Sequence, residues 1–89
     1  MRVAVYPGTF DPLTLGHFDL IRRSSVLFDR VIVAVAVTSA KATAMFTGDE
    51  RVAMIREEMA AMGFANVEVD YLDTLLVDYC RRRGVRVVV

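Results

Sequence analysis

The stretch that decides the fold is residues 2–17, RVAVYPGTFDPLTLGH. Residues 2–6 form a short aliphatic run that Pro7 and Gly8 close, and this pattern predicts a β-strand. Thr14 has a suitable side chain to cap a helix that begins just after it. A strand, a loop and a helix therefore follow one another directly, and this unit sets the pattern for the rest of the chain.

Two long helices are predicted from capping signals and apolar periodicity. The first runs from Thr14 to about residue 28. Thr47 and Glu50 form a capping-box pattern that opens the second, and Gly63 is a natural end for it. The expected inward-facing residues are Phe18, Ile21, Ser25 and Phe28 in the first helix and Val52, Ile55, Met59 and Met62 in the second.

A third helix is predicted to open at Asp73 or Thr74 and to end at Gly84. Further strands are predicted from β-rich apolar runs at residues 31–37, 67–71 and 85–89. The resulting order, β-α-β-α-β-α-β, implies one α/β domain over residues 1–89, with a parallel sheet and helices on both faces. We expect the last strand to lie beside the first, since a unit of this class turns back across its first strand there.

The composition limits the partners of the chain. It has 89 residues, 55% of them hydrophobic, with 11 acidic and 11 basic side chains. Balanced charge gives no large field for nucleic acid or an anionic membrane, so neither is an expected partner. The single cysteine, Cys80, excludes an internal disulfide and favours a cytoplasmic location. The longest aliphatic run, residues 31–37, is far too short to span a bilayer.

The loop after the first strand carries the candidate chemistry, because ligands of parallel sheets bind beyond the carboxyl ends of the strands. Gly8 allows a ligand to approach closely, and Thr9 offers a hydroxyl and a backbone N–H. The helix start at Thr14 provides free N–H groups and the positive end of a helix dipole, which favour a phosphate. Gly16 leaves that end open, and the imidazole of His17 can donate to a phosphate oxygen.

Each of these residues also has an ordinary explanation. Gly8 and Pro12 are common turn residues, Thr14 can serve only as a cap, and an isolated histidine such as His17 is usually an ordinary surface or half-buried residue. Their combination in this order, between a strand and a helix, is hard to explain as turn chemistry. The sequence has neither a Walker-type loop nor the G-x-G-x-x-G dinucleotide fingerprint.

Two segments of this loop resemble a known signature. GTFDP at 8–12 and TLGH at 14–17 are similar to the nucleotidyltransferase superfamily with the (His/Thr)-x-Gly-His motif. The preceding Tyr-Pro and the Thr at position 14 narrow the resemblance to the phosphopantetheine adenylyltransferases. Cytidylyltransferases and nicotinate-nucleotide adenylyltransferases more often carry His at that position. The similarity continues over nearly the whole chain, through residues 28–29, 41, 45–47, 50–52, 66–69 and 75–79.

The resemblance implies a Rossmann-like fold and a role for several residues. His17 would be the catalytic residue, binding ATP phosphates and stabilising the transition state. Thr9 and Phe10 would border the ATP site, and Thr9 would also contact the phosphate of the pantetheine substrate. Lys41 would hold that phosphate, and Leu76 would line the pantetheine arm. Lys41 follows the second strand, where its charge can neutralise a phosphate, although the residue alone is better explained as a solvated loop lysine.

The implied reaction is adenylyl transfer from ATP to 4′-phosphopantetheine, which gives dephospho-coenzyme A and pyrophosphate in coenzyme A biosynthesis. The attacking phosphate is already charged, so positioning and charge stabilisation suffice and no protein nucleophile is needed. Mg²⁺ is expected with the ATP, without a dedicated carboxylate cage. The family forms hexamers, so a homo-oligomer is expected, with coenzyme A or dephospho-coenzyme A as product or feedback ligand.

The family continues past the fourth strand with further nucleotide-binding segments. We therefore expect residues 1–89 to be an incomplete domain with little adenylyl transfer of its own. Two other functions stay open. One is a different nucleotidyltransferase that uses CTP or nicotinate mononucleotide, against which Thr14 argues. The other is a non-catalytic module that binds a phosphate or nucleotide, or a folding fragment that only self-associates.

Overall fold

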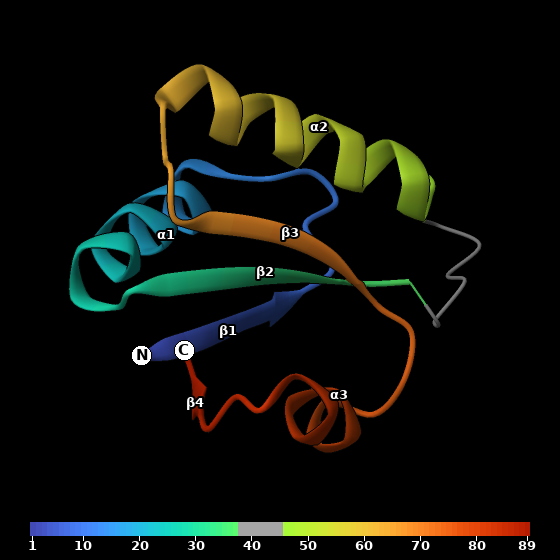
Figure 1. Ribbon diagram of the computed structural model, residues 1–89. Coiled ribbons are helices and arrows are strands. Elements are labelled where there is room, and N and C mark those ends of the chain that lie inside the picture. The colour runs from blue at the N-terminus through green and yellow to red at the C-terminus, as the bar shows by residue number, and fades with distance from the viewer. Residues whose placement is uncertain (38–45) are drawn as a thin grey trace.

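The computed structural model describes residues 1–37 and 46–89, and within them the chain forms a four-stranded parallel sheet with helices packed on it (Figure 1). The predicted order of strands and helices is confirmed. The elements along the chain are β1 (Val3–Gly8), α1 (Leu15–Leu27), β2 (Arg30–Ala36), α2 (Gly48–Met62), β3 (Val67–Leu72), α3 (Leu76–Arg83) and β4 (Val87–Val88).

The strand order in the sheet is β3-β2-β1-β4, so β1 lies between two neighbours. It pairs with β2 along its whole length, from Val3 opposite Arg30 to Gly8 opposite Val35. On its other side β4 pairs with it only through Val87 and Val88. The predicted placement of the last strand beside the first is confirmed.

The last strand is shorter than the predicted range of 85–89. Gly84 ends α3 in the left-handed conformation with φ of 68°, and the Val85 N–H still donates to the Cys80 carbonyl at 2.9 Å. Val85 therefore belongs to the end of the helix, and its buried side chain packs under the sheet instead of extending it.

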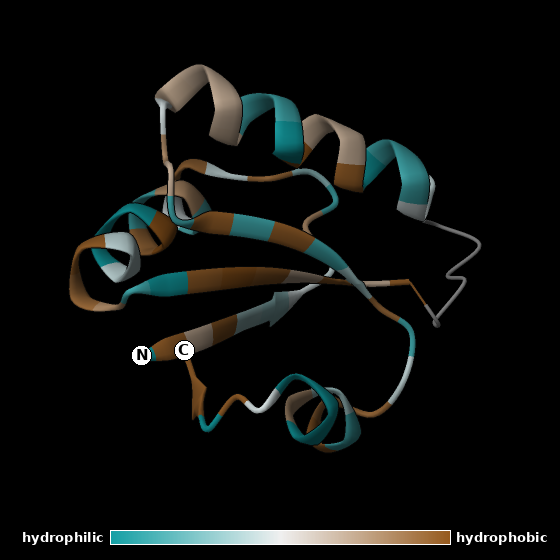
Figure 2. Cartoon of the chain, viewed as in Figure 1, coloured by the Kyte–Doolittle hydropathy of each residue, from teal (hydrophilic) through white to brown (hydrophobic). Residues whose placement is uncertain are grey.

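The two faces of the sheet carry separate apolar clusters. α1 and α2 cover one face, and α3 covers the other, which confirms the expected two-sided arrangement. In Figure 1 the sheet lies between α2 at the top of the view and α3 at the bottom. Figure 2 shows β2 apolar along most of its length, as expected for a strand covered on both faces. The buried members are Phe10, Ile21, Val33, Val35, Val52, Ile55, Met59 and Val69 in the first cluster and Val5, Ile32, Ala34, Leu72, Tyr79 and Val85 in the second.

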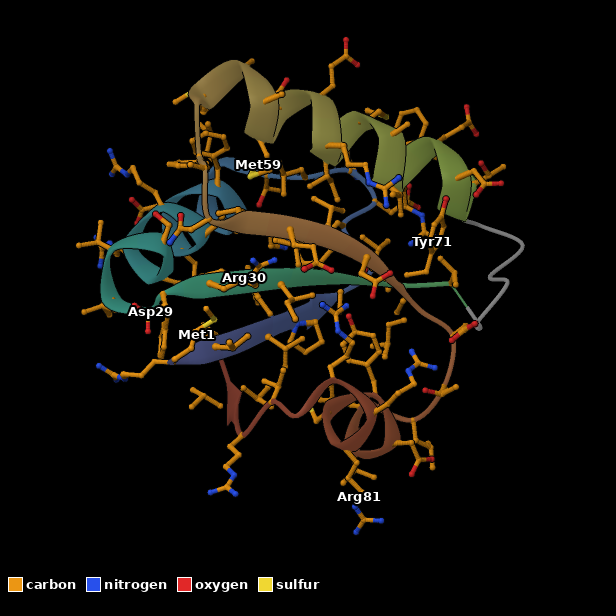
Figure 3. The ribbon with its side chains drawn as sticks, in the orientation of Figure 1. Met1, Asp29, Arg30, Met59, Tyr71 and Arg81 are labelled. Carbon is orange, nitrogen blue, oxygen red and sulfur yellow. The ribbon has the colours of Figure 1, made fainter. Side chains whose placement is uncertain are left out.

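A few predicted helix positions differ from the structure. The buried face of α1 is centred on Ile21 and Ser24, so Ser25 lies at its rim. On α2, Met59 points toward the sheet and is 3% exposed, whereas Met62, the last helical residue, is 52% exposed (Figure 3). The cap of α3 is Leu75, which offers no side-chain hydrogen bond, and not Asp73 or Thr74. No helix in the described ranges is both long and apolar enough to cross a membrane.

A polar network joins α3 to the sheet. The Tyr79 hydroxyl donates to Asp70 Oδ2 at 2.7 Å, and Arg83 Nη1 donates to the same oxygen at 2.8 Å. Arg83 also pairs with Glu68 at 2.9 Å. Burial by itself would raise the pKa of Asp70, but the hydrogen bonds from Tyr79 and the Tyr71 N–H, together with the charge of Arg83, hold that pKa below its usual value.

Asp70→Asn is expected to lower the free energy of unfolding by about 1–2 kcal/mol at neutral pH, because it removes the charge that accepts these hydrogen bonds. The folded-state pKa of Asp70 is lowered. Its contribution is therefore complete above the pKa of an unfolded aspartate and is lost as the pH falls through the folded-state value. Urea unfolding of both proteins, from neutral to acid pH, measures the difference.

The control for this experiment is Asp73→Asn, in the loop before α3, where the carboxylate is exposed. This change is expected to have little effect at any pH. A stability difference between wild type and Asp70→Asn that stays constant into the acid range would show that the charge of Asp70 does not carry the effect.

Candidate functional site

The carboxyl ends of β1, β2 and β3 lie at one edge of the sheet because the strands are parallel. Residues 9–14, which we call the motif loop, connect β1 to α1 at this edge. Asp11 Oδ1 accepts a hydrogen bond from the Phe46 N–H at 3.0 Å, which ties the loop to the chain entering α2. The Asp11–Pro12 peptide is cis. The motif loop is thus attached to both helices on its face of the sheet.

The side chain of Phe10 fills the centre of the motif loop. It is 2% exposed and packs edge-on against Tyr6 and His17, with ring centroids 5.3 Å and 4.9 Å away. Its backbone adopts a positive φ of 48°, a conformation that costs a non-glycine residue roughly 1–2 kcal/mol. The buried ring contacts hold the residue in this conformation.

The ring of Phe10 lies against Gly8. A Cβ added at Gly8 would stand 3.0 Å from Phe10 Cζ, closer than such atoms normally approach. The space left by the missing side chain is therefore taken by an aromatic ring of the protein, and not by a ligand as the sequence had indicated. Gly8 therefore affects the site indirectly, because its missing side chain leaves the space in which the Phe10 ring packs.

Thr14 and His17 cap α1 reciprocally. The Thr14 N–H donates to His17 Nδ1 at 3.0 Å, and the His17 N–H donates to Thr14 Oγ1 at 3.3 Å. The Thr14 hydroxyl also lies 3.1 Å from Nδ1. A ring nitrogen that accepts a hydrogen bond carries no proton, so the neutral imidazole carries its proton on Nε2. The cap therefore orients the ring of His17 and leaves it an Nε2–H donor.

The start of α1 is suited to an anion. The N–H groups of Leu15 and Gly16 have no hydrogen-bond partner among the described residues, and the first turn contains no acidic side chain. A Cβ placed on Gly16 would meet only Thr14 Oγ1, at 3.7 Å. Free N–H groups, the positive helix end and an imidazole donor within one turn form a site for phosphate oxygens.

The structure places three of the predicted site residues together and separates a fourth. Thr9 is exposed at the end of β1, next to Phe10, whose ring contacts His17. Leu76 lies on the opposite face of the sheet, half-buried against the second cluster. There it lines an open groove of about 740 Å³ between α3 and β4. Lys41 lies outside the described residues.

A second hollow lies beside the motif loop on the α1 and α2 face. It has a volume of about 470 Å³, and its walls include Phe10, Thr14 and Arg51 but neither Thr9 nor His17. The expectation that Thr9 and His17 share one pocket stays a prediction.

Arg51 is a residue of this edge that the sequence analysis did not single out. It lies on α2 and is 7% exposed. Its Nη1 donates to the Thr9 carbonyl at 2.6 Å and to the Ala36 carbonyl at 3.0 Å, and its Nε donates to the Thr47 carbonyl at 3.3 Å. The sequence does contain a feature that points to Arg51. It lies beside the apolar stripe of α2, one turn before Ile55, where a charged side chain is unusual.

Gly8→Ala is expected to destabilise the protein by about 1–3 kcal/mol, because the new methyl group overlaps the Phe10 ring. The matched control is Gly16→Ala, whose new methyl group meets only ordinary contact and which should be neutral or stabilising by up to about 1 kcal/mol. Urea unfolding measures both changes. Equal stabilities of the two variants would show that Gly8 has no special packing role.

Comparisons with known proteins agree with this architecture. A family model described as cytidylyltransferase-like matches residues 5–89. A phosphopantetheine adenylyltransferase of Alkalilimnicola ehrlichii is 58% identical over 87 residues, which cover 97% of the chain and 49% of that relative. A phosphopantetheine adenylyltransferase of Frankia alni is 50% identical over 91 residues, covering 100% of the chain and 56% of the relative. The chain spans about half the length of these curated relatives.

A solved structure supports the fold independently. The lipopolysaccharide core biosynthesis protein from Thermoplasma volcanium superposes with a TM-score of 0.76 over 99% of the chain and 72% of that protein. Its sequence is 22% identical, so this likeness concerns the Rossmann-like fold alone. The resemblance that the motif loop indicated is confirmed by the sequence relatives. Since the family model matches nearly the whole length, the chain belongs to the cytidylyltransferase-like family.

Proposed function

We propose that the chain acts in adenylyl transfer from ATP to 4′-phosphopantetheine, giving dephospho-coenzyme A and pyrophosphate. The observation that carries this proposal is the cap of α1. It leaves the Nε2–H of His17 and the N–H groups of Leu15 and Gly16 available within one helical turn. The 58% identity to a phosphopantetheine adenylyltransferase supports the choice of substrates.

The proposed reaction is a direct displacement at phosphorus. An oxygen of the phosphate on 4′-phosphopantetheine attacks the α-phosphorus of ATP. The bond from that phosphorus to the bridging oxygen breaks, and pyrophosphate leaves with the electron pair. Because the nucleophile is already an anion, the protein needs to align the two substrates and offset the charge that develops between them.

The predicted site residues have different roles in this reaction. His17 donates from Nε2 to an α-phosphate oxygen, most strongly where negative charge grows in the transition state. Thr9 and Phe10 border the nucleotide phosphates at the end of β1, and Thr9 also contacts the phosphate of the pantetheine substrate. Lys41 binds that attacking phosphate as a point charge, and Leu76 lines the pantetheine arm. A homo-oligomer in the cytoplasm, with coenzyme A or dephospho-coenzyme A as a further ligand, completes the proposal.

Magnesium belongs to the proposal as the ion that accompanies ATP. Within residues 1–37 and 46–89, no three His, Cys, Asp or Glu side chains gather in a way that could hold a metal ion. No step of the proposed reaction depends on a protein-bound magnesium ion.

The proposed function is tested by two measurements on the purified chain. Calorimetry measures ATP binding, and a single-turnover assay with radiolabelled ATP and 4′-phosphopantetheine detects even slow transfer. The expected result is ATP binding with pyrophosphate release that requires 4′-phosphopantetheine. Transfer with CTP and an alcohol phosphate would favour a cytidylyltransferase instead. ATP binding without any transfer would favour a phosphate-binding module.

His17→Ala is expected to slow single-turnover transfer about 10²–10³-fold, because a donor that meets charge developing in the transition state contributes roughly that factor. Its effect on the affinity for 4′-phosphopantetheine should be much smaller. His17→Asn is the matched variant, since its amide can still donate a hydrogen bond. A His17→Ala protein that transfers at the wild-type rate would exclude the role in the transition state.

Lys41→Ala is expected to act on the other substrate. It should weaken the binding of 4′-phosphopantetheine, because a positive charge beside its phosphate is lost. ATP affinity should change little. Titration calorimetry with each substrate separates the two effects, and an unchanged affinity for 4′-phosphopantetheine would rule out this assignment.

A further inference from the structure

Arg51 is a buried cation whose hydrogen bonds within residues 1–37 and 46–89 all go to backbone carbonyls. It is 7% exposed, and within the described residues no carboxylate lies at ion-pair distance from it. Removing a charge from water is costly unless hydrogen bonds compensate for it. Here the compensation comes from the carbonyls of Thr9, Ala36 and Thr47. Such an arrangement leaves the positive charge of the guanidinium without a neutralising anion from the described part of the protein.

The three acceptors belong to three separate segments. Thr9 follows β1, Ala36 ends β2, and Thr47 caps α2. The carboxyl end of a parallel strand exposes carbonyl oxygens, whose partial negative charge repels a phosphate. Arg51 donates hydrogen bonds to two of these oxygens, those of Thr9 and Ala36. This makes this edge of the sheet more favourable for an anion.

The bond to Thr9 also determines where the next N–H points. The only cis peptide among the described residues is Asp11–Pro12, so the Thr9–Phe10 peptide is trans. In a trans peptide the carbonyl and the following N–H point in opposite directions. Because the Thr9 carbonyl points to Arg51, the Phe10 N–H points away from the guanidinium. That N–H has no hydrogen-bond partner among the described residues.

We propose that Arg51 is a positioning residue of the phosphate site. It holds the Thr9 carbonyl toward α2 and thereby presents the Phe10 N–H to a phosphate group of the nucleotide. The identity of the nucleotide rests on the proposed function, but the orientation of the Thr9–Phe10 peptide does not. The positive φ of Phe10 fits this arrangement, since the ring contacts hold its side chain and the Arg51 bond holds the preceding carbonyl.

Arg56 provides a matched control on the same helix. It also donates to one strand carbonyl, Val69 O, at 3.1 Å, and lies over the ring of Tyr71. Tyr71 lies on β3, close to the start of α2 (Figure 3). Arg56 is more exposed than Arg51, and its hydrogen bond goes to β3 and not to the motif loop, so its replacement tests the loss of an arginine from α2 without removing the bond to Thr9.

The experiment compares Arg51→Met, Arg51→Lys and Arg56→Met in the 89-residue chain. Calorimetry with ATP and with inorganic pyrophosphate measures affinity, and amide NMR spectra with and without pyrophosphate report on Phe10. We expect Arg51→Met to bind ATP about 10-fold more weakly or worse, because a well-placed backbone donor to a charged oxygen contributes about such a factor. Arg51→Lys keeps the charge but reaches fewer carbonyls, so it should recover part of the loss. Arg56→Met should bind as wild type.

The NMR spectra make the test independent of the proposed function. Without ligand, Arg51→Met should move the amide signals of Thr9 and Phe10 while leaving those of Val33 and Val69 in the core unchanged. If wild type binds neither ATP nor pyrophosphate, the proposed function fails, and the ligand-free spectra alone decide the role of Arg51. If Arg51→Met does not fold, Arg51→Lys takes its place. A folded Arg51 variant with wild-type affinity, or with unchanged Thr9 and Phe10 signals, would overturn the proposal.

Discussion

The pairing of β1 with β2 is the constraint on which the rest of the structure depends. The two strands run parallel in register over six residue pairs, from Val3 opposite Arg30 to Gly8 opposite Val35. Parallel pairing requires a crossover helix, and here α1 makes that crossover directly after the motif loop. The end of β1 and the start of α1 are therefore held close together. Thr9, Phe10 and His17 lie in or next to this connection, and Arg51 packs against it.

Within that connection the side chain of His17 serves both the helix cap and the proposed chemistry. His17 Nδ1 accepts from Thr14 and completes the cap of α1, which satisfies backbone N–H groups that would otherwise be unpaired. The second nitrogen of the ring is left to donate. If both ring nitrogens of His17 took part in the cap, no donor would be left for a ligand. If neither did, the ring would be free to rotate. The two-nitrogen imidazole meets both needs.

The conformation of the motif loop around Phe10 depends on contacts with side chains from other parts of the fold. Phe10 is held in a left-handed conformation by its ring packing between Tyr6 and His17, and Gly8 leaves the space for that ring. Arg51 donates a hydrogen bond to the preceding carbonyl, that of Thr9. The loop thus owes its shape to a packed aromatic ring and a buried cation.

The order of the elements, the caps at Thr14 and Thr47, the helix ends at Gly63 and Gly84, and the candidate site after β1 were all predictable from the amino-acid sequence. These features depend on hydrogen bonds and periodicities within a few neighbouring residues, which a single chain displays directly. Only the tertiary structure decided what fills the space at Gly8, that Leu76 lies across the sheet from His17, and what Arg51 binds. The carbonyls of Thr9 and Ala36, to which Arg51 donates, are 42 and 15 residues away along the chain. Contacts of that range exist only after the sheet has assembled, because it is the parallel alignment of β1 and β2 that places both carbonyls at one edge.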